Sequence, residues 1–155
     1  MAEQPAARRP APPQRAAFPH FTPIQTRWLD NDVYGHVNNS VYGHYVDTAI
    51  NDWLIGNGIV DLHGADGLIG LVVETRCVFF DSVAFPDRLE AGLRIAALGK
   101  SSVTFEVGIF RQGEVQASAL GVCVHVYVDR ATRRPTPLLE AERARFATLL
   151  AAPAG

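Results

Sequence analysis

Cysteine is scarce in this chain, which has two among its 155 residues, Cys77 and Cys123. Neither stands in a C-x-x-C spacing, and both lie in strand-like surroundings. This pattern argues against a disulfide or a cysteine-based metal site and favours buried thiols in a reducing cytoplasm. His, Asp and Glu also show no metal-ligand spacing, so the sequence predicts no metal.

The chain also lacks long apolar runs and an excess of basic charge. Hydrophobic residues make up 48% of it, but charged residues interrupt every apolar run before membrane-spanning length. The formal net charge of −2 gives no electrostatic case for nucleic acid. A G-x-S-x-G elbow and the Walker and Rossmann glycine patterns are missing as well. We therefore expect a soluble cytoplasmic protein with no membrane or nucleic-acid partner.

The N-terminal stretch differs in composition from the rest of the chain. Residues 1–18 are rich in Ala, Pro and Arg and have no apolar segment of signal-peptide length. We expect a disordered tail over these residues. Its arginines leave open a transit peptide or an acidic partner, although Glu3 and the prolines argue against a targeting helix. Residues 19–155 have the size of one domain.

Polar chemistry concentrates in residues 26–54. The first half reads as a loop rich in groups that can move protons or orient a carbonyl: Asp30, Asn31, Asp32, Tyr34, Gly35, His36, Asn38 and Asn39. The second half has a helical apolar period over residues 40–54, with Asn39 or Ser40 as N-cap and Gly56 and Gly58 at the C-terminal stop. A helix N-terminus favours negative charge, so an oxyanion could be stabilised there.

The rest of the chain predicts mostly strands. A short strand fits residues 21–28, and a glycine-rich flexible connection covers 57–70. Period-two alternation then predicts strands that start at residues 71, 89, 103 and 115, joined by hairpins. A final helix is expected over 138–150, with Thr136 as N-cap and Pro137 at its first position. We predict an α+β fold in which an antiparallel sheet curls around the helix over 40–54.

The string D-x-D-x-x-G-H-V-N-N-x-x-Y over residues 30–42 resembles the opening motif of the hotdog-fold thioesterases, which include 4-hydroxybenzoyl-CoA thioesterase and plant acyl-ACP thioesterases. Weaker similarity extends over residues 72–89 and 98–111. The resemblance implies a hotdog fold and hydrolysis of an acyl-CoA thioester to a carboxylic acid and CoA. No cofactor is needed, because a thioester is already activated. An acyl-ACP hydrolase and a non-catalytic acyl-binding protein remain alternatives.

The resemblance also assigns catalytic residues. Asp32 stands where the family has its catalytic carboxylate, as general base or nucleophile. From the residues alone, an Asx turn shaped by Asp30 and Asp32 explains the pattern equally well, and we expect Asp30 to be structural. His36 matches a family histidine, for which we expect an orienting or substrate-contacting role. Glu74 resembles the second acidic residue of the acyl-ACP branch, with a solvent-facing glutamate as the alternative.

Other residues complete the predicted site. Tyr34 replaces a catalytic asparagine of the plant branch, so an asparagine-dependent mechanism is not expected. The substrate-binding candidates are Tyr34, Asn39, Tyr42, Gly70 and Lys100. We expect Asn38 or Asn39 to cap the helix, and His125 to be a hydrogen-bonded sheet residue. The family pairs two sheets, which implies a homodimer or homotetramer with Asp32 and Glu74 of one site on different chains.

Overall fold

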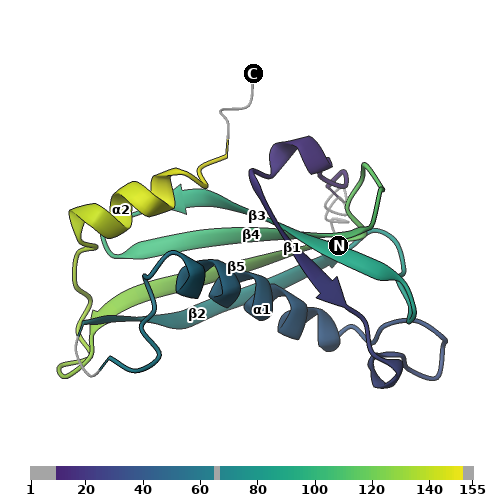
Figure 1. Ribbon diagram of the computed structural model, residues 1–155, viewed down its shortest axis with the longest axis horizontal. Helices are drawn as coiled ribbons and strands as arrows, with labels where there is room; N and C mark the ends of the chain where they lie inside the picture. The colour runs from purple at the N-terminus through teal and green to yellow at the C-terminus, as the bar shows by residue number, and fades with distance from the viewer. Residues whose placement is uncertain (1–9, 65–66, 152–155) are drawn as a thin grey trace, which may run out of the picture.

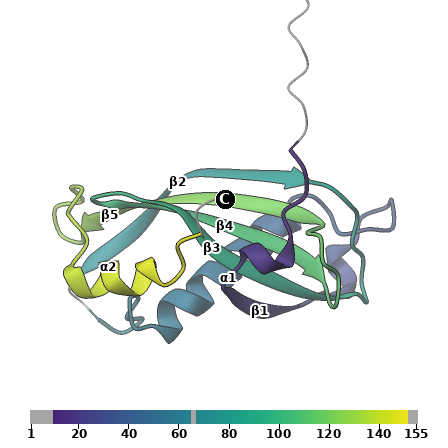
Figure 2. The same cartoon turned by 90° about the horizontal axis from the view of Figure 1, so that it is seen from above.

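The computed structural model describes residues 10–64 and 67–151. Its strands form one antiparallel sheet in the order β1-β3-β4-β5-β2: β1 (His20–Gln25), β2 (Leu68–Phe79), β3 (Arg88–Leu98), β4 (Ser102–Arg111) and β5 (Ala119–Asp129). The helices are α1 (Val41–Gly56) and α2 (Glu140–Ala147), with short 3-10 turns at Arg15–Ala17 and Trp28–Asp30. Figure 1 shows α1 lying along one face of the sheet, and Figure 2 shows the sheet arching over it. The predicted curled sheet around a helix is confirmed.

The apolar face of α1 forms the centre of the core. The helical period predicts an apolar face that includes Val41, which is only partly buried, and the seven buried residues Tyr42, Tyr45, Val46, Ala49, Ile50, Trp53 and Leu54. They pack against inward-facing residues of β3, β4 and β5. A Cβ at Gly121 of β5 would overlap the Val46 side chain, so glycine at this position lets the helix approach the sheet closely.

The two edges of the sheet differ. β1 is short, carries Pro23 in its middle and, within the described residues, pairs only with β3. β2 is twelve residues long, and in the part of the chain that the structure describes it pairs only with β5. This ladder has a bulge at Val73, between Val72 and Glu74. The side chains of Leu71, Val72 and Val73 are 37%, 51% and 61% exposed. β2 therefore presents an open apolar edge, whereas proline interrupts β1.

Several element boundaries differ from the predicted ones. β1 ends at Gln25, before the 3-10 turn at Trp28–Asp30, and β2 begins at Leu68, inside the expected flexible connection. β5 begins at Ala119, because the backbone near Val115 bonds to the N-terminal segment instead.

The C-terminal helix is also shorter than predicted. It starts at Glu140, because Pro135 and Thr136 pair with β5, where the Thr136 N–H donates to the Tyr127 carbonyl at 3.0 Å. Neither Thr136 nor Pro137 therefore starts the helix, and Leu139 is its N-cap. No helix within residues 10–64 and 67–151 is long and apolar enough to cross a membrane.

The segment before β1 packs against the sheet, in contrast to the expected disordered tail. Phe18 is 5% exposed and contacts Phe110 and Phe21 edge-on. Arg15 forms a 2.7 Å ion pair with Glu90 and lies over the Phe21 ring. The predicted disorder is thus wrong for residues 10–18, because one buried aromatic residue anchors a sequence of low complexity. Residues 1–9 lie outside the described part of the chain.

Candidate active site

A tight loop between β1 and α1 places Asp32 opposite His36. The Asp32 N–H donates to the His36 carbonyl at 2.9 Å, and the Gly35 N–H donates to the Asp32 carbonyl at 3.1 Å. Gly35 has a φ of +84°, which a residue with a side chain adopts only under strain. The glycine of the sequence pattern therefore closes the turn and brings the aspartate and histidine to the same side of the loop.

The two carboxylate oxygens of Asp32 have different surroundings. Oδ1 accepts a 2.8 Å hydrogen bond from the Tyr34 N–H, which is an Asx turn, and it lies 3.9 Å from His36 Nδ1. Oδ2 has no hydrogen-bond partner among the described residues. The side chain is 18% exposed. One oxygen thus orients the carboxylate, while the other stays available to an incoming molecule.

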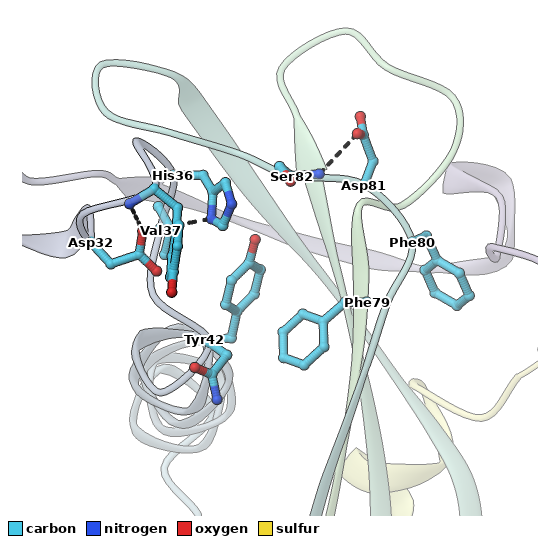
Figure 3. Close-up of a pocket in the computed structure, with 10 residues that line it drawn as sticks. Asp32, His36, Val37, Tyr42, Phe79, Phe80, Asp81 and Ser82 are labelled. Atoms are coloured by element: carbon cyan, nitrogen blue, oxygen red, sulfur yellow. Dashed lines mark hydrogen bonds and ion pairs between the residues drawn. The ribbon is translucent and has the colours of Figure 1, made fainter.

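Asp32 and His36 line a pocket of about 460 Å³ (Figure 3). Its walls come from the loop, the first turn of α1 and the end of β2 with the following residues: Asp32, Tyr34, His36, Val37, Asn39, Tyr42, Phe79, Phe80, Asp81 and Ser82. Figure 3 shows Tyr42 standing between the loop and Phe79. The two rings meet edge-on with centroids 5.0 Å apart. Burial raises the pKa of Tyr42, so its hydroxyl stays protonated at neutral pH.

The wall opposite Asp32 was not predicted from the sequence. Arg111 forms a 2.7 Å ion pair with Asp81, contacts Asp87 at 3.2 Å and donates to the Ser82 carbonyl. The hydrogen bond from Arg111 lowers the pKa of Asp81 below its ordinary value. The Val37 N–H, at the end of the loop, donates to the Val83 carbonyl at 2.8 Å and joins the two walls. In the sequence, this wall is indicated only by two polar residues, Asp81 and Ser82, directly after the alternating pattern of β2.

Asp30 is fully buried and holds the start of the loop. Its carboxylate accepts hydrogen bonds from the Tyr45 hydroxyl at 2.7 Å and from the Arg27 N–H and Nε at 2.8 and 2.9 Å. Burial raises the pKa of Asp30, but these hydrogen bonds outweigh it, and the pKa lies below its ordinary value. Asp30 therefore ties the loop to α1 and leaves no oxygen free for a substrate.

The side chain of Asn38 turns the chain into the start of α1. Its Oδ1 accepts hydrogen bonds from the Ser40 N–H at 3.0 Å and the Ser40 hydroxyl at 2.8 Å. Ser40 occupies the N-cap position, which confirms one of the two predicted N-caps, although its side chain makes no capping hydrogen bond. Asn39 is exposed, lines the Asp32 pocket, and also lines a second cavity of about 230 Å³ between α1 and β2.

Three predicted site residues lie away from the Asp32 pocket within one chain. Glu74 is exposed on the open edge strand, just after the bulge. Lys100 is exposed in the turn between β3 and β4. Gly70 lines a separate cavity of about 290 Å³ near the C-terminal end of α1. The pocket thus brings together Asp32, Tyr34, His36, Asn39 and Tyr42, but not these three.

The prediction for His125 is wrong. His125 and Tyr127 are 4% and 2% exposed, yet neither imidazole nitrogen nor the tyrosine hydroxyl has a hydrogen-bond partner among the described residues. Both cysteines are free thiols whose pKa burial raises to about 11. In residues 10–64 and 67–151, no three His, Cys, Asp or Glu side chains group as metal ligands.

Comparisons with known proteins give the chain a family. A family model described as the thioesterase-like superfamily matches residues 26–146. The crystal structure of the PA5185 protein from Pseudomonas aeruginosa strain PAO1 is 47% identical, covers 92% of this chain and 99% of its own, and has a TM-score of 0.86. No sequence among the curated proteins matches significantly.

Two further solved structures are similar over most of the chain. A thioesterase from Thermus thermophilus, complexed with coenzyme A and Zn, is 28% identical with a TM-score of 0.70, over 86% of this chain and 95% of its own. Slr0204, a 1,4-dihydroxy-2-naphthoyl-CoA thioesterase from Synechocystis, is 19% identical with a TM-score of 0.73, over 82% of this chain and 94% of its own. At that identity the second likeness concerns the fold alone, which is the expected hotdog fold.

Proposed function

Because the chain belongs to the thioesterase-like superfamily, we propose that it hydrolyses an acyl-CoA thioester to a carboxylic acid and CoA. The observation that carries this proposal is the free Oδ2 of Asp32 in a pocket beside the N-terminus of α1. Thioester cleavage needs an attacking oxygen, and an oriented carboxylate can supply or activate one. The thiols of Cys77 and Cys123 are poor alternatives, since their raised pKa keeps them protonated at neutral pH.

Asp32 acts in one of two ways. As a general base, it takes a proton from a water that attacks the thioester carbon, after which the C–S bond breaks and CoA leaves as a thiolate. As a nucleophile, its Oδ2 attacks the same carbon, CoA leaves, and water hydrolyses the resulting anhydride. In both routes His36, whose Nδ1 lies 3.9 Å from Oδ1, contacts the substrate, because the Tyr34 N–H already orients the carboxylate.

The α1 N-terminus provides the electrostatic part of the mechanism. Negative charge develops on the thioester oxygen during attack, and a helix N-terminus stabilises charge of that sign. Gly43 lies in the first turn of α1 and lines the cavity between α1 and β2, with no atom within 4 Å of where a Cβ would be. The absence of a side chain there leaves room for a carbonyl group close to the helix backbone.

CoA as the carrier is supported by the Thermus thermophilus relative, whose structure contains coenzyme A. The exposed side chain of Lys100 could bind a CoA phosphate. The relative also contains Zn, but we assign no step of this reaction to a metal.

We further propose a homodimer formed by pairing of β2 edges. The three exposed apolar residues Leu71, Val72 and Val73 would become covered, and the free backbone groups of the strand would be paired. Glu74, which lies outside the Asp32 pocket of its own chain, would then contribute to the partner's site. A homotetramer built from such dimers is compatible with the same contact.

The proposed activity is tested by the release of free thiol from short, long and aromatic acyl-CoAs, measured with a thiol reagent. The two protein thiols are titrated first, since Cys77 is only partly buried. We expect turnover on at least one acyl group. If no acyl-CoA is hydrolysed but acyl-ACP is, the substrate is an acyl-ACP and not an acyl-CoA. If neither is hydrolysed, the protein binds acyl groups without cleaving them. Sedimentation analysis tests the dimer, and a fully active monomer would overturn it.

A further inference from the structure

The core of the protein contains a polar pair that the proposed reaction does not use. His125 and Tyr127 are neighbours on the inward face of β5, with ring centroids 6.3 Å apart, among the aromatic residues Phe105 and Phe146. Both are at least nine-tenths buried, and their three polar side-chain atoms lack partners among the described residues. Buried polar atoms are usually hydrogen-bonded, so this pair requires an explanation.

The pair lies next to the lining of the groove between α1 and β2, although neither residue is itself part of that lining. This groove, the 230 Å³ cavity, shares Asn39 with the Asp32 pocket and extends along α1 to Asp47. At that end its lining includes Val72, whose register partner is His125, and Cys123, which precedes His125 on the same face of β5. From Asn39 to Asp47 the helix rises about 12 Å, at about 1.5 Å per residue.

Gly70 of β2 places no side chain over the pair, whose polar atoms are buried. A Cβ at Gly70 would lie 3.1 Å from His125 Nδ1 and 3.2 Å from Tyr127 Cζ. Gly70 is exposed and lines the separate 290 Å³ cavity, whose lining includes Asn51, one helical turn after Asp47. Any side chain at position 70 would cover His125 Nδ1. With glycine at position 70, no side chain of β2 would stand between this nitrogen and a group that enters between α1 and β2.

We propose that the groove between α1 and β2 is the acyl channel, and that His125 and Tyr127 bind a hydroxyl group at the end of an aliphatic acyl chain. This proposal rests on the proposed thioesterase function. The proposed substrates are therefore ω-hydroxyacyl thioesters. Their thioester carbon would lie next to Asp32 and the α1 N-terminus, and their hydroxyl group would lie next to Gly70.

A neutral hydroxyl fits this end of the channel better than a carboxylate does. Burial lowers the pKa of His125 although the nearby Asp47 opposes the shift, so the imidazole is neutral at pH 7. A neutral imidazole has one donor and one acceptor nitrogen, and a hydroxyl group complements both roles. The charge of Asp47 would repel a terminal carboxylate.

The experiment compares kcat/KM for matched pairs of acyl-CoAs of increasing length, such as octanoyl-CoA and 8-hydroxyoctanoyl-CoA. At one chain length we expect the hydroxylated member to be preferred by about tenfold, the value of one good neutral hydrogen bond. Tyr127→Phe and His125→Leu should each reduce this ratio to near one while the plain acyl-CoA is still hydrolysed. Phe146→Leu changes packing in the same cluster without removing a polar group and should keep the preference.

Non-hydrolysable thioether analogues of the same pairs, measured by calorimetry, separate this proposal from the proposed activity. If no thioester is cleaved but the hydroxylated thioether binds more tightly at one length, the channel stands and the hydrolase function fails. Equal kcat/KM and equal affinity at every length would overturn the hydroxyl site, and so would a preference that survives both Tyr127→Phe and His125→Leu.

Discussion

His36 Nδ1 lies 3.9 Å from Asp32 Oδ1, across a turn that Gly35 closes. This separation is too long for a hydrogen bond but short enough for an electrostatic interaction. The orientation of Asp32 is set by the Tyr34 N–H at 2.8 Å, not by the histidine. A change at His36 should therefore affect the reaction less than a change at Asp32, because the carboxylate keeps its position without the imidazole.

Asp32→Asn should lower turnover by at least about a hundredfold, the lower end of the range for a lost general base. The amide keeps an oxygen for the Tyr34 N–H but cannot deprotonate water or attack a thioester carbon. The thermal midpoint should stay near wild type, because the side chain is partly exposed and makes one hydrogen bond. Steady-state kinetics and a thermal melt check both expectations. Near-normal turnover by the folded variant would remove Asp32 from the mechanism.

Hydrolysis in ¹⁸O-water under single-turnover conditions distinguishes the two roles of Asp32. Label in the Asp32 carboxylate, found by mass spectrometry of the protein, would indicate an anhydride. Label confined to the released acid would indicate attack by water.

Mixing two inactive variants tests whether Glu74 acts across the dimer. If each site combines Asp32 of one protomer with Glu74 of its partner, Asp32→Asn and Glu74→Gln each inactivate both sites of their homodimer. After subunit exchange, every mixed dimer has one intact site, so about a quarter of wild-type activity should return in a symmetric two-subunit assembly. Recovery is measured after mixing at equal concentrations. An active Glu74→Gln homodimer, or a mixture without recovery despite exchange, would contradict a shared site.

Asp30→Asn should lower the stability of the protein, whereas Asp32→Asn should lower its turnover. Asp30 is fully buried and accepts hydrogen bonds from Tyr45 and Arg27, so loss of its charge should cost about 2 kcal/mol of unfolding free energy at pH 7. The folded pKa of Asp30 lies below its ordinary value of 3.8. Its contribution is therefore complete above about pH 4 and is lost as the pH falls through the folded value.

Urea unfolding of wild type and Asp30→Asn at several pH values measures this difference. The difference in unfolding free energy between the two proteins should be constant from pH 7 to pH 5 and should become smaller at more acidic pH. A difference in unfolding free energy that stays constant down to pH 2 would show that it does not come from the charge of Asp30.

Phe18→Ala should cost about 3 kcal/mol, at the lower end of the range for a buried phenylalanine. Phe18 packs on Phe21 and Phe110 outside the main core, and this small cluster holds residues 10–18 against the sheet. Chemical denaturation gives the free energy, and Pro19→Ala serves as an exposed neighbouring control. Wild-type stability in Phe18→Ala would restore the expectation of an unattached N-terminal segment.

The parts of the site predictable from the sequence are those that lie close together in the chain. Asp32, His36 and Tyr42 fall within eleven residues, and a single loop and helix start are enough to bring them into one pocket. Asp81 and Ser82 reach the same pocket only through the pairing of β2 with β5. Local periodicity contains no information on that register.

Two other features depend on burial that no local pattern reports. His125 lies in a strand whose alternation is clear from the sequence, but its missing hydrogen bonds follow from what surrounds it on three other elements. Phe18 is one aromatic residue in a stretch rich in proline and alanine, and its burial depends on Phe110, more than ninety positions away.

The unequal edges of the sheet limit how far it can grow. At one edge Pro23 lacks the N–H that a further strand would require, whereas β2 at the other edge keeps its free backbone groups. A sheet with one open edge can be extended by one partner, and the joined sheet then ends in a proline-bearing strand on both sides. If two chains pair through β2 as proposed, growth by strand addition stops there, and the apolar edge of β2 can remain in the sequence without leading to fibres.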